Sequence, residues 1–390
     1  MKHLDLAPCR ASLAALATAI ILPGCAGSTS DDGPERAAFL TLMGDDTLAV
    51  EWMEFGDGYV NAEALVRGSR TTFAQYHLMT SGTGEVAMYT ESVYAGGSSD
   101  GELIRMVGLV QGEEGRALVT TQNGEERRQE FTGGPGSVPF IDMLHWPFEA
   151  ALRGQVSGGG IGDEVPTFTG RGMSFGLIAN EDGTWGLRHP SRGVSTMWLD
   201  EEGRIVKLDG TGSTRAYQLT RTSWDELDQV ALGAAFADRP LGALSGRGQI
   251  DSAVLGVHFT GNHGSPQRRG RHIFGTLLAY GVWWRTGANQ PTHLSFDRDI
   301  VIDGDVIPAG DYTLSSIPEE DGGTLIINTQ TGQGGQSYDE ALDQARVRLR
   351  RDTLTELVEG FEIRVVETDD GGRIELRWDD TVYWVPFTVP

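Results

Sequence analysis

Short segments in which apolar and polar residues alternate, separated by turns rich in glycine, constrain the fold of this chain most. Glycine occurs 54 times in 390 residues. In the first such segment Leu48, Val50 and Trp52 share one face, because side chains alternate between the two sides of a β-strand. The pairs Asn123-Gly124 and Asp303-Gly304 favour tight hairpins. The sequence therefore predicts an all-β protein with a few short helices.

Residues 38–237 are expected to form an antiparallel β domain built on a curved sheet. Around residues 138–152 the pattern changes, with helical spacing at Phe140, Met143 and Leu144, and Pro147 suits the first turn of a second short helix. Short helices are thus predicted to pack on one face of the sheet.

A further helix is predicted just before the end of this domain. Ser223 and Glu226 have the spacing of a capping box, in which each side chain satisfies a free backbone amide. The apolar stripe expected for this helix comprises Trp224, Leu227, Val230, Ala231 and Ala234.

A curved antiparallel sheet with helices on it resembles the half-barrels of periplasmic lipid-carrier lipoproteins. The resemblance is one of architecture and implies a cavity for a lipid or another apolar molecule, lined by Trp52, Phe73, Met88 and Phe148. The alternative is a concave face that its own helices fill, since apolar helices normally cover sheets. Both interpretations stay open at this point.

Residues 1–25 are predicted to be an export signal. Lys2 and Arg10 precede an apolar run at residues 14–22 that is too short to span a bilayer. The run ends in Leu22-Pro23-Gly24-Cys25, which resembles the lipobox of bacterial lipoproteins. This resemblance implies lipidation at Cys25, followed by a flexible tether at 26–37. A plain secretory signal is the alternative.

The resemblance to bacterial lipoproteins also implies a location. Ala26 follows the cysteine, which favours an anchor in the outer membrane, facing the periplasm or the exterior. Cys9 and Cys25 are the two cysteines of the chain, so a mature protein would have neither a disulfide nor a free thiol. The formal net charge of −24 disfavours nucleic acid as a partner, because the chain would repel phosphate backbones.

Residues 238–248 lack periodicity and are predicted to be a linker. Beyond them, short strands with tight turns predict a β-sandwich over residues 249–390.

This C-terminal region resembles the bacterial domain-of-unknown-function family 2911. The resemblance covers roughly residues 245–390 and is carried by motifs that recur in order: Ser265-Pro266, Arg269-Gly270-Arg271, Ile273-Phe274-Gly275, Tyr280-Gly281, Trp284-Arg285-Thr286-Gly287-Ala288-Asn289, Ile307-Pro308-Ala309-Gly310-Asp311-Tyr312-Thr313-Leu314 and Ser337-Tyr338-Asp339. The family has no assigned activity to carry over. The chain departs from it at Asn262-His263-Gly264, where members tend to have a tyrosine-glycine-arginine run.

One stretch, residues 263–289, concentrates arginine, tryptophan and histidine in an otherwise acidic chain. Arginine forks bind carboxylate, phosphate or sulfate oxygens at two points and also stack on aromatic rings. The predicted site for a small anionic or carbohydrate ligand comprises His263, Arg269, Arg271, Trp284, Arg285 and Asn289. The alternative is that Arg285 and Asn289 tie loop carbonyls together and pair with acids such as Asp297 or Asp339.

No metal, cofactor or catalytic residue is expected. His263, His272 and His293 lack paired metal-ligand spacing. Ser174 lies in a G-x-S-x-G string, but a strand and not a helix is expected to follow it, unlike a nucleophile elbow.

The sequence therefore favours an envelope-anchored binding or interaction protein that uses loops of the sandwich, and leans away from an enzyme. A carrier of lipid in the N-terminal domain is one alternative. A hydrolase of envelope material is another, and it would need a histidine or carboxylate pair near Arg285.

Overall fold

The computed structural model describes residues 33–390, except for 114, 170–171, 214 and 243–244. The predicted export signal, Cys25 and most of the predicted tether lie outside the described residues. Within the described part, no helix has both the length and the apolar character that crossing a membrane requires.

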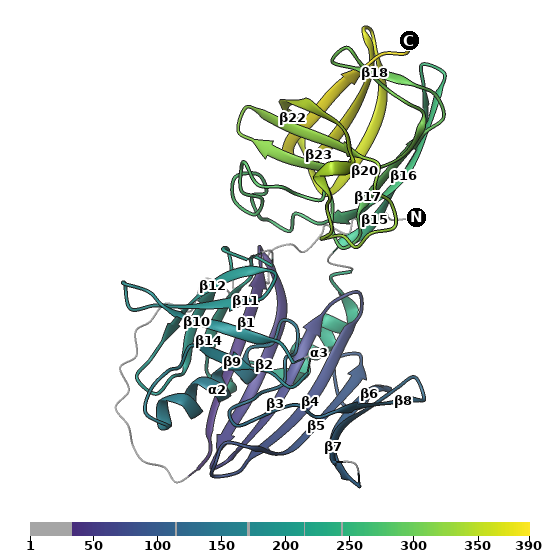
Figure 1. Cartoon of the computed structure of the whole chain (residues 1–390). Coiled ribbons are helices and arrows are strands. Elements are labelled where there is room, and N and C mark those ends of the chain that lie inside the picture. The colour runs from purple at the N-terminus through teal and green to yellow at the C-terminus, as the bar shows by residue number, and fades with distance from the viewer. Residues whose placement is uncertain (1–32, 114, 170–171, 214, 243–244) are drawn as a thin grey trace, which may run out of the picture. The chain divides into compact units, whose positions relative to one another are not determined.

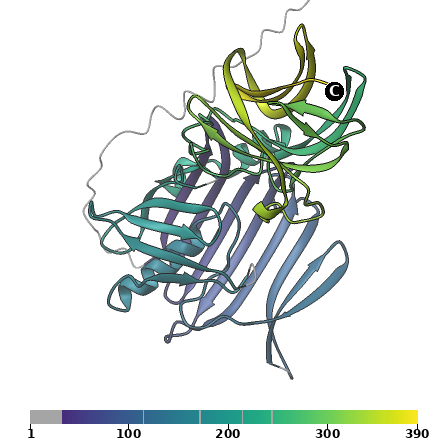
Figure 2. The same cartoon turned by 45° about the horizontal axis from the view of Figure 1, so that its top comes forward.

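The N-terminal domain is built on one 14-stranded antiparallel sheet, in the order β8-β7-β6-β5-β4-β3-β2-β1-β14-β13-β12-β11-β10-β9 (Figure 1). Strands β1 to β8 follow one another as a meander, and β14 pairs with β1, so the later strands extend the same sheet on its other side. The broad, curved sheet is also plain in Figure 2. The predicted curved, half-barrel-like sheet is confirmed.

The elements of this domain are β1 (Glu35–Met43), β2 (Asp46–Gly56), β3 (Tyr59–Arg67), β4 (Thr71–Thr80), β5 (Val86–Ala95), β6 (Leu103–Gly112), β7 (Gly115–Gln122), β8 (Glu125–Glu130), α2 (Trp146–Ser157), β9 (Glu164–Pro166), β10 (Ser174–Ala179), β11 (Trp185–His189), β12 (Gly193–Leu199), β13 (Ile205–Asp209), β14 (Gln218–Thr222), η1 (Trp224–Glu226) and α3 (Gln229–Asp238). Strand β1 thus begins inside the stretch expected to be a tether.

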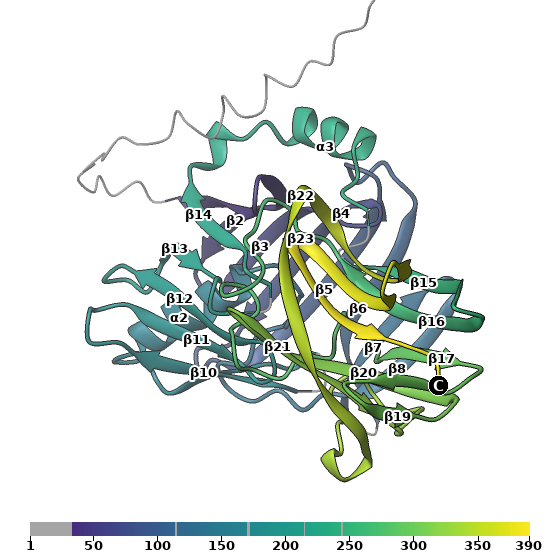
Figure 3. The ribbon, with the colours of Figure 1, turned by 90° about the horizontal axis from the view of Figure 1, so that it is seen from above.

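The two helices cover opposite faces of the sheet (Figure 3). On β2, Met53 packs in the cluster that contains Phe148 of α2, whereas Trp52 packs in a second cluster with Phe236 of α3. The prediction that the helices share one face is therefore wrong. The reason is visible in β2 itself, where a run from Leu48 to Met53 is buried on both sides and needs cover on both.

Two local helix predictions differ from the structure. Helix α2 begins at Trp146 with Pro147 in its first turn, as predicted, but Phe140 to Leu144 form an irregular segment with one turn at residues 142–143 instead of a helix. Met143 has a φ of 72°, in the left-handed region that a right-handed helix excludes.

The capping box at Ser223 does not form. The Ser223 side chain makes no capping hydrogen bond, and the Glu226 carboxylate instead accepts one from Thr222 Oγ1 at 2.6 Å. Helix α3 starts later and is capped by Asp228, which accepts from the Ala231 amide at 3.0 Å. Val230, which was predicted to lie on the buried apolar face of this helix, is instead 81% exposed.

The C-terminal domain is the predicted β-sandwich. Its seven-stranded antiparallel sheet runs in the order β15-β16-β17-β20-β21-β22-β23, and the long β22 also lies against β15 and β16. One apolar core fills the space between the layers. The elements are β15 (Ser245–Val254), β16 (Val257–Pro266), β17 (Thr292–Phe296), β18 (Ile300–Ile302), β19 (Asp305–Ile307), β20 (Gly310–Glu319), β21 (Gly322–Asn328), η2 (Glu340–Leu342), β22 (Asp343–Thr368) and β23 (Gly371–Phe387).

Two features of this domain bear on the sequence predictions. Asp303 and Gly304 have φ values of 51° and 92° and join β18 to β19, so the predicted tight hairpin is confirmed. Strand β15 begins at Ser245, inside the stretch 238–248 that was expected to be a linker.

Candidate functional site

A long loop, residues 267–291, joins β16 to β17 and carries most of the predicted site. Trp284 anchors it to the edge of a strand: the Trp284 amide donates to Ser316 O at 2.7 Å, and the Ser316 amide donates to Trp284 O at 2.8 Å. This short extended stretch therefore pairs with β20. Because side chains alternate along an extended chain, Trp284 faces one way, and Trp283 and Arg285 face the other.

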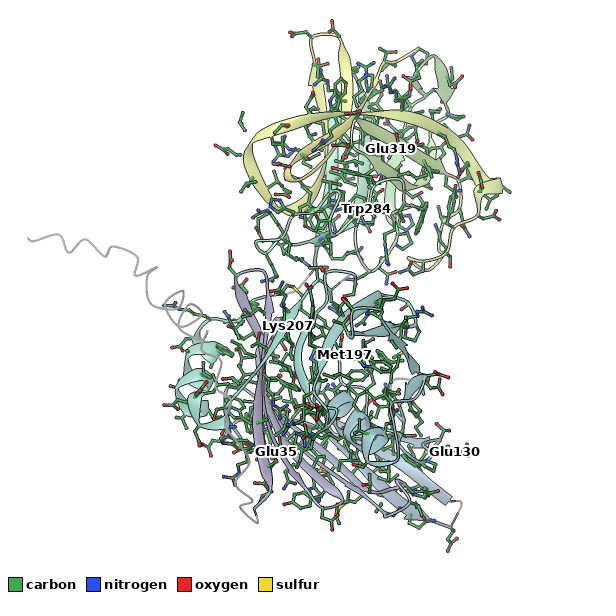
Figure 4. All side chains as sticks on the ribbon, turned by 90° about the vertical axis from the view of Figure 1, so that its left-hand side faces the viewer. Glu35, Glu130, Met197, Lys207, Trp284 and Glu319 are labelled. Atoms are coloured by element: carbon green, nitrogen blue, oxygen red, sulfur yellow. The ribbon has the colours of Figure 1, made fainter. Side chains whose placement is uncertain are left out.

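Trp284 faces the apolar core of the sandwich (Figure 4). Its ring stacks on Trp378 with centroids 6.0 Å apart and meets Phe361 edge-on at 5.0 Å. Its Nε1 donates to Gly287 O at 3.1 Å, so its polar atom is also satisfied within the loop. Trp284 thus holds the loop on the core.

Trp283 and Arg285 line a small pocket on the opposite side, with a volume of about 10 Å³. Thr313 and Ser315 of β20 and Asn328 of β21 also line it, and all three are buried. On β20, Thr313 and Ser315 alternate with Leu314, which lies in the core. The rest of the wall comes from residues 333–338, between β21 and β22. We call this the Arg285 pocket.

Three residues that line the Arg285 pocket carry buried polar atoms without a hydrogen-bond partner in the described part of the chain. These atoms are Trp283 Nε1, Ser315 Oγ and Gln333 Oε1. A buried polar group without a partner typically costs about 1–3 kcal/mol, so native structures keep few of them. Their concentration at one small pocket marks a place where one polar atom, of a water or of a ligand, would complete the hydrogen bonding.

Arg285 supplies the charge of the pocket. Among the described residues its guanidinium has no carboxylate partner, and its one hydrogen bond runs from Nη1 to Asn289 O at 3.1 Å. Burial lowers the pKa of the Arg285 guanidinium below its ordinary value. A partly buried cation with a single carbonyl partner is poorly compensated, and an anion would compensate it.

The backbone beside Arg285 is held in an unfavourable conformation. Thr286 has a φ of 53° and Asn289 a φ of 65°, and for a β-branched residue such as threonine this region is strained. The surroundings impose it: Thr286 Oγ1 donates to Ser316 Oγ at 2.8 Å, and Thr292 Oγ1 donates to Thr286 O at 2.6 Å. Strain that the fold overdetermines tends to mark functional loops.

The other walls of the pocket are positioned by their own hydrogen bonds. Tyr338 stacks on Trp283 with ring centroids 5.5 Å apart, and its hydroxyl donates to Asp343 Oδ2 at 2.7 Å. Gln333 Nε2 donates to Thr313 Oγ1 at 3.1 Å, which orients the unpartnered Oε1 of the same amide. The lining is therefore ordered before any ligand arrives.

The structure divides the six predicted site residues into groups. Arg271, Trp284, Arg285 and Asn289 line one common hollow, and Arg285 alone of the six also lines the Arg285 pocket. The Arg271 guanidinium donates to loop carbonyls, including Arg268 O at 2.9 Å.

The other two predicted residues line neither hollow. His263 is 2% exposed, packs edge-on against Phe361 and lies over Gly248, where a Cβ would collide with its ring. The Arg269 amide donates to Glu359 Oε1 at 2.8 Å.

The alternative interpretation, in which Arg285 binds loop carbonyls and pairs with nearby acids, is correct only for the carbonyl. Arg285 does bind a loop carbonyl, but the acids named for it are engaged elsewhere. Asp297 Oδ1 accepts from the His258 amide at 2.8 Å, and Asp339 Oδ1 accepts from the Ala341 amide at 3.0 Å.

Sequence reasoning missed Ser315, Asn328 and Gln333, and it selected Trp284 where Trp283 lines the polar pocket. The available signal was the polar alternation of β20, where Thr313 and Ser315 alternate with the apolar residues Tyr312 and Leu314. A solvent-facing strand shows the same pattern, so the burial of these residues was not evident.

The described residues contain no group of three or more histidine, cysteine, aspartate or glutamate side chains suited to a metal ion. Ser174 begins strand β10 and donates to Glu164 Oε2 at 2.8 Å, so the predicted strand after this serine is confirmed. The described lining of the Arg285 pocket includes neither a histidine nor a carboxylate.

Comparison with known proteins identifies one relationship. Residues 245–387 match the family described as "Protein of unknown function (DUF2911)", which is the C-terminal β-sandwich and includes the whole Arg285 pocket. No curated protein matches the chain.

Proposed function

We propose that this protein is an envelope-anchored lipoprotein whose C-terminal sandwich binds a small organic anion at Arg285, which lines both the Arg285 pocket and the larger hollow that it shares with Arg271, Trp284 and Asn289. The observation that carries the proposal is the combination of an arginine without a described acid partner and unpartnered polar atoms around one pocket.

The chemistry of the lining favours a hydroxylated carboxylate that places one oxygen in the Arg285 pocket and its body in the larger hollow, about 300 Å³, that Arg285 also lines. A monosaccharide acid is the simplest example. The Arg285 guanidinium suits the carboxylate. Ser315 Oγ and Gln333 Oε1 suit hydroxyl groups, and Trp283 Nε1 adds a donor. The stacked Trp283 and Tyr338 rings give an apolar surface beside these groups.

Isothermal titration of the full chain with glucuronate tests this proposal. We expect glucuronate to bind more tightly than glucose, which lacks the carboxylate, and than acetate, which lacks the hydroxyls. Arg285→Gln should weaken glucuronate binding roughly tenfold to hundredfold, in line with a charge-assisted hydrogen bond of about 1.5–3 kcal/mol.

Two further variants separate the pocket from general charge effects. Trp283→Phe keeps the ring and removes Nε1, and should weaken binding by a smaller factor. Arg298→Gln removes an exposed arginine of the same domain and should change nothing. Equal binding of glucuronate and glucose, or an unchanged Arg285→Gln titration, would refute the proposed ligand class.

The lipid anchor is tested separately. Mass spectrometry of the protein extracted from envelopes should find acyl groups on Cys25, and Cys25→Ser should release the protein from the membrane fraction. An intact, unacylated cysteine in the membrane-extracted protein would contradict the anchor.

A carrier function in the N-terminal domain is a second candidate, favoured by a hollow of about 840 Å³ beside α2. Apolar side chains such as Phe55, Leu78 and Ala151 line it. The cavity expected from the sequence is wrong, because Trp52 and Phe73 pack with α3, and Phe148 packs on the other face of the sheet.

Displacement of a fluorescent fatty acid tests the carrier candidate. Ala151→Trp would fill the hollow and should abolish probe binding, whereas Arg285→Gln should leave it unchanged. Probe binding that survives Ala151→Trp in a folded protein would remove this candidate.

A further inference from the structure

Helix α3 covers only part of its face of the N-terminal sheet. Phe73 of β4 packs in one cluster with Phe236 of α3, and Thr71 Oγ1, at the start of β4, donates to Phe236 O. Toward the other end of β4, and on β5 and β6, the same face carries apolar side chains that remain exposed. They are Met79, Met88, Met106 and Val110, each between 37% and 47% exposed. We call these four residues the methionine patch.

Strand pairing places the methionine patch on the face that α3 covers in part. One row of directly paired residues crosses β2 to β6 and comprises Trp52, Glu63, Gln75, Ser92 and Met106. Trp52 packs in the α3 cluster, so Met106 lies on the α3 face. Met79, Met88 and Val110 each stand four residues from that row on their own strands, and an even spacing keeps a side chain on one face. The four side chains therefore share one surface.

The methionine patch lies on a surface with little charge. The residues between the patch and the row of paired residues, on the same face of the three strands, are His77, Thr90 and Gly108. Over residues 75–79, 88–92 and 106–110 this face therefore has neither a carboxylate nor a lysine or arginine. Exposed apolar residues that adjoin one another mark sites of contact with a protein or a membrane, and flexible methionine side chains adapt to a partner without a fixed shape.

The methionine patch lies close to the point where the chain enters the sheet. Glu35 begins β1, and its row of direct partners leads across β2 and β3 to Leu78, the neighbour of Met79. Met88 is four strands from β1 in the sheet, which is roughly 20 Å at about 4.8 Å per strand. Cys25 precedes Glu35 by ten residues, which span at most roughly 35 Å. A lipid on Cys25 would therefore keep this end of the sheet within reach of the bilayer.

We propose that the methionine patch rests on the lipid bilayer that holds the anchor. The patch then supplies a second contact that fixes the orientation of the N-terminal sheet, whereas the anchor alone leaves the sheet free to turn. A formal net charge of −24 repels an anionic surface, so an uncharged apolar patch suits lipids without net charge. The inference rests on the lipid anchor at Cys25 of the proposed function and is independent of the Arg285 pocket.

A fluorescent label on the methionine patch tests the proposal. Met88→Cys introduces a thiol into the lipidated protein, in which signal cleavage removes Cys9 and acylation blocks Cys25. The thiol is labelled with bimane, and the protein is placed in phosphatidylcholine vesicles. We expect spin-labelled phosphatidylcholine to quench most of the fluorescence and aqueous iodide to quench little. The matched control is Val206→Cys on β13, six strands away in the sheet and 45% exposed, where iodide should quench and the lipid should not.

Removal of the neighbouring apolar side chains should release the label. With Met79→Ser and Val110→Ser, quenching of the label at position 88 by lipid should fall several-fold, and quenching by iodide should rise. The control pair Val230→Ser and Val306→Ser removes exposed apolar side chains elsewhere and should change neither. Circular dichroism confirms that each variant is folded.

Flotation with the vesicles separates this inference from the anchor. Protein that does not float refutes the anchor and this inference together. Protein that floats with a label open to iodide refutes only the inference. A label shielded from both quenchers shows that protein, such as a second copy of this chain, covers the patch, and it overturns the proposal as well.

Discussion

Arginines meet two very different environments in this molecule. Beside α2, Arg153 and Arg221 both bind Glu149, at 2.8 and 2.7 Å, and both also reach Glu35. Glu149 is fully buried. In the sandwich, Arg285 is partly buried with a single carbonyl partner and no carboxylate among the described residues.

The difference separates structural arginines from an arginine available for recognition. In the N-terminal network each guanidinium is compensated within the fold, so a ligand would have to displace an internal carboxylate. The positive charge of Arg285 has no carboxylate partner among the described residues, and neighbouring polar atoms lack hydrogen-bond partners in the same part of the chain. Burial alone does not distinguish the two cases, whereas the presence of a charge partner does.

The largest expected effect is at Glu149. Glu149→Gln leaves two guanidiniums facing a neutral amide and weakens the bond from the Ile205 amide, now 2.9 Å. Breaking a buried ion pair costs about 3–5 kcal/mol of unfolding free energy, which urea denaturation would measure. The matched control is Glu54→Gln at the exposed Arg36–Glu54 pair, expected to cost no more than about 1 kcal/mol. Similar losses for both variants would contradict the distinction.

Acid should weaken the same network. The hydrogen bond from Arg153 lowers the pKa of Glu35 below its ordinary value of 4.5. A lowered pKa stabilises the folded state above pH 4.5, and this contribution disappears as pH falls through the folded-state value. Glu35→Gln should therefore lose stability at neutral pH and show a shallower acid decline in unfolding free energy between neutral pH and pH 3. If the unfolding free energies of the wild-type protein and of Glu35→Gln changed in parallel with pH, the prediction would be contradicted.

Arg285 should matter little for folding. Arg285→Gln removes one hydrogen bond to a carbonyl and also relieves a poorly compensated charge, so the unfolding free energy should change by less than about 1 kcal/mol. Urea denaturation of the variant measures it alongside the glucuronate titration. A loss near that of Glu149→Gln would place Arg285 with the structural arginines.

The smallest effect is expected at Asn289. Arg285 contacts the backbone oxygen of Asn289 and not its side chain, and the residue has a φ of 65° that glycine adopts without strain. Asn289→Gly should leave glucuronate affinity within about twofold and change stability by less than about 1 kcal/mol. Asn289→Val, which is strained at this φ, should instead lower both, as measured by the same titration and denaturation.

The site illustrates how far the sequence could go. The cluster of arginine and tryptophan at residues 263–289 predicted a site on the loop between β16 and β17, and Trp283 and Arg285 of that loop line the Arg285 pocket. Which tryptophan lines the pocket was decided by the pairing of Trp284 with Ser316, because one-residue alternation sends neighbouring side chains to opposite faces. Ser315, Asn328 and Gln333 reach the pocket from segments that local pattern cannot bring together.

The sequence by itself determined the class of fold, since period-two alternation and glycine turns act locally and dictate strands and hairpins wherever they occur. It also determined the tight turn at Asp303-Gly304. Only the tertiary structure decided that the two helices cover opposite faces of the sheet. It also decided that Arg285, unlike Arg153 and Arg221, has no carboxylate partner among the described residues. Charge pairing and burial depend on which distant segments meet, and that follows from packing across the whole chain.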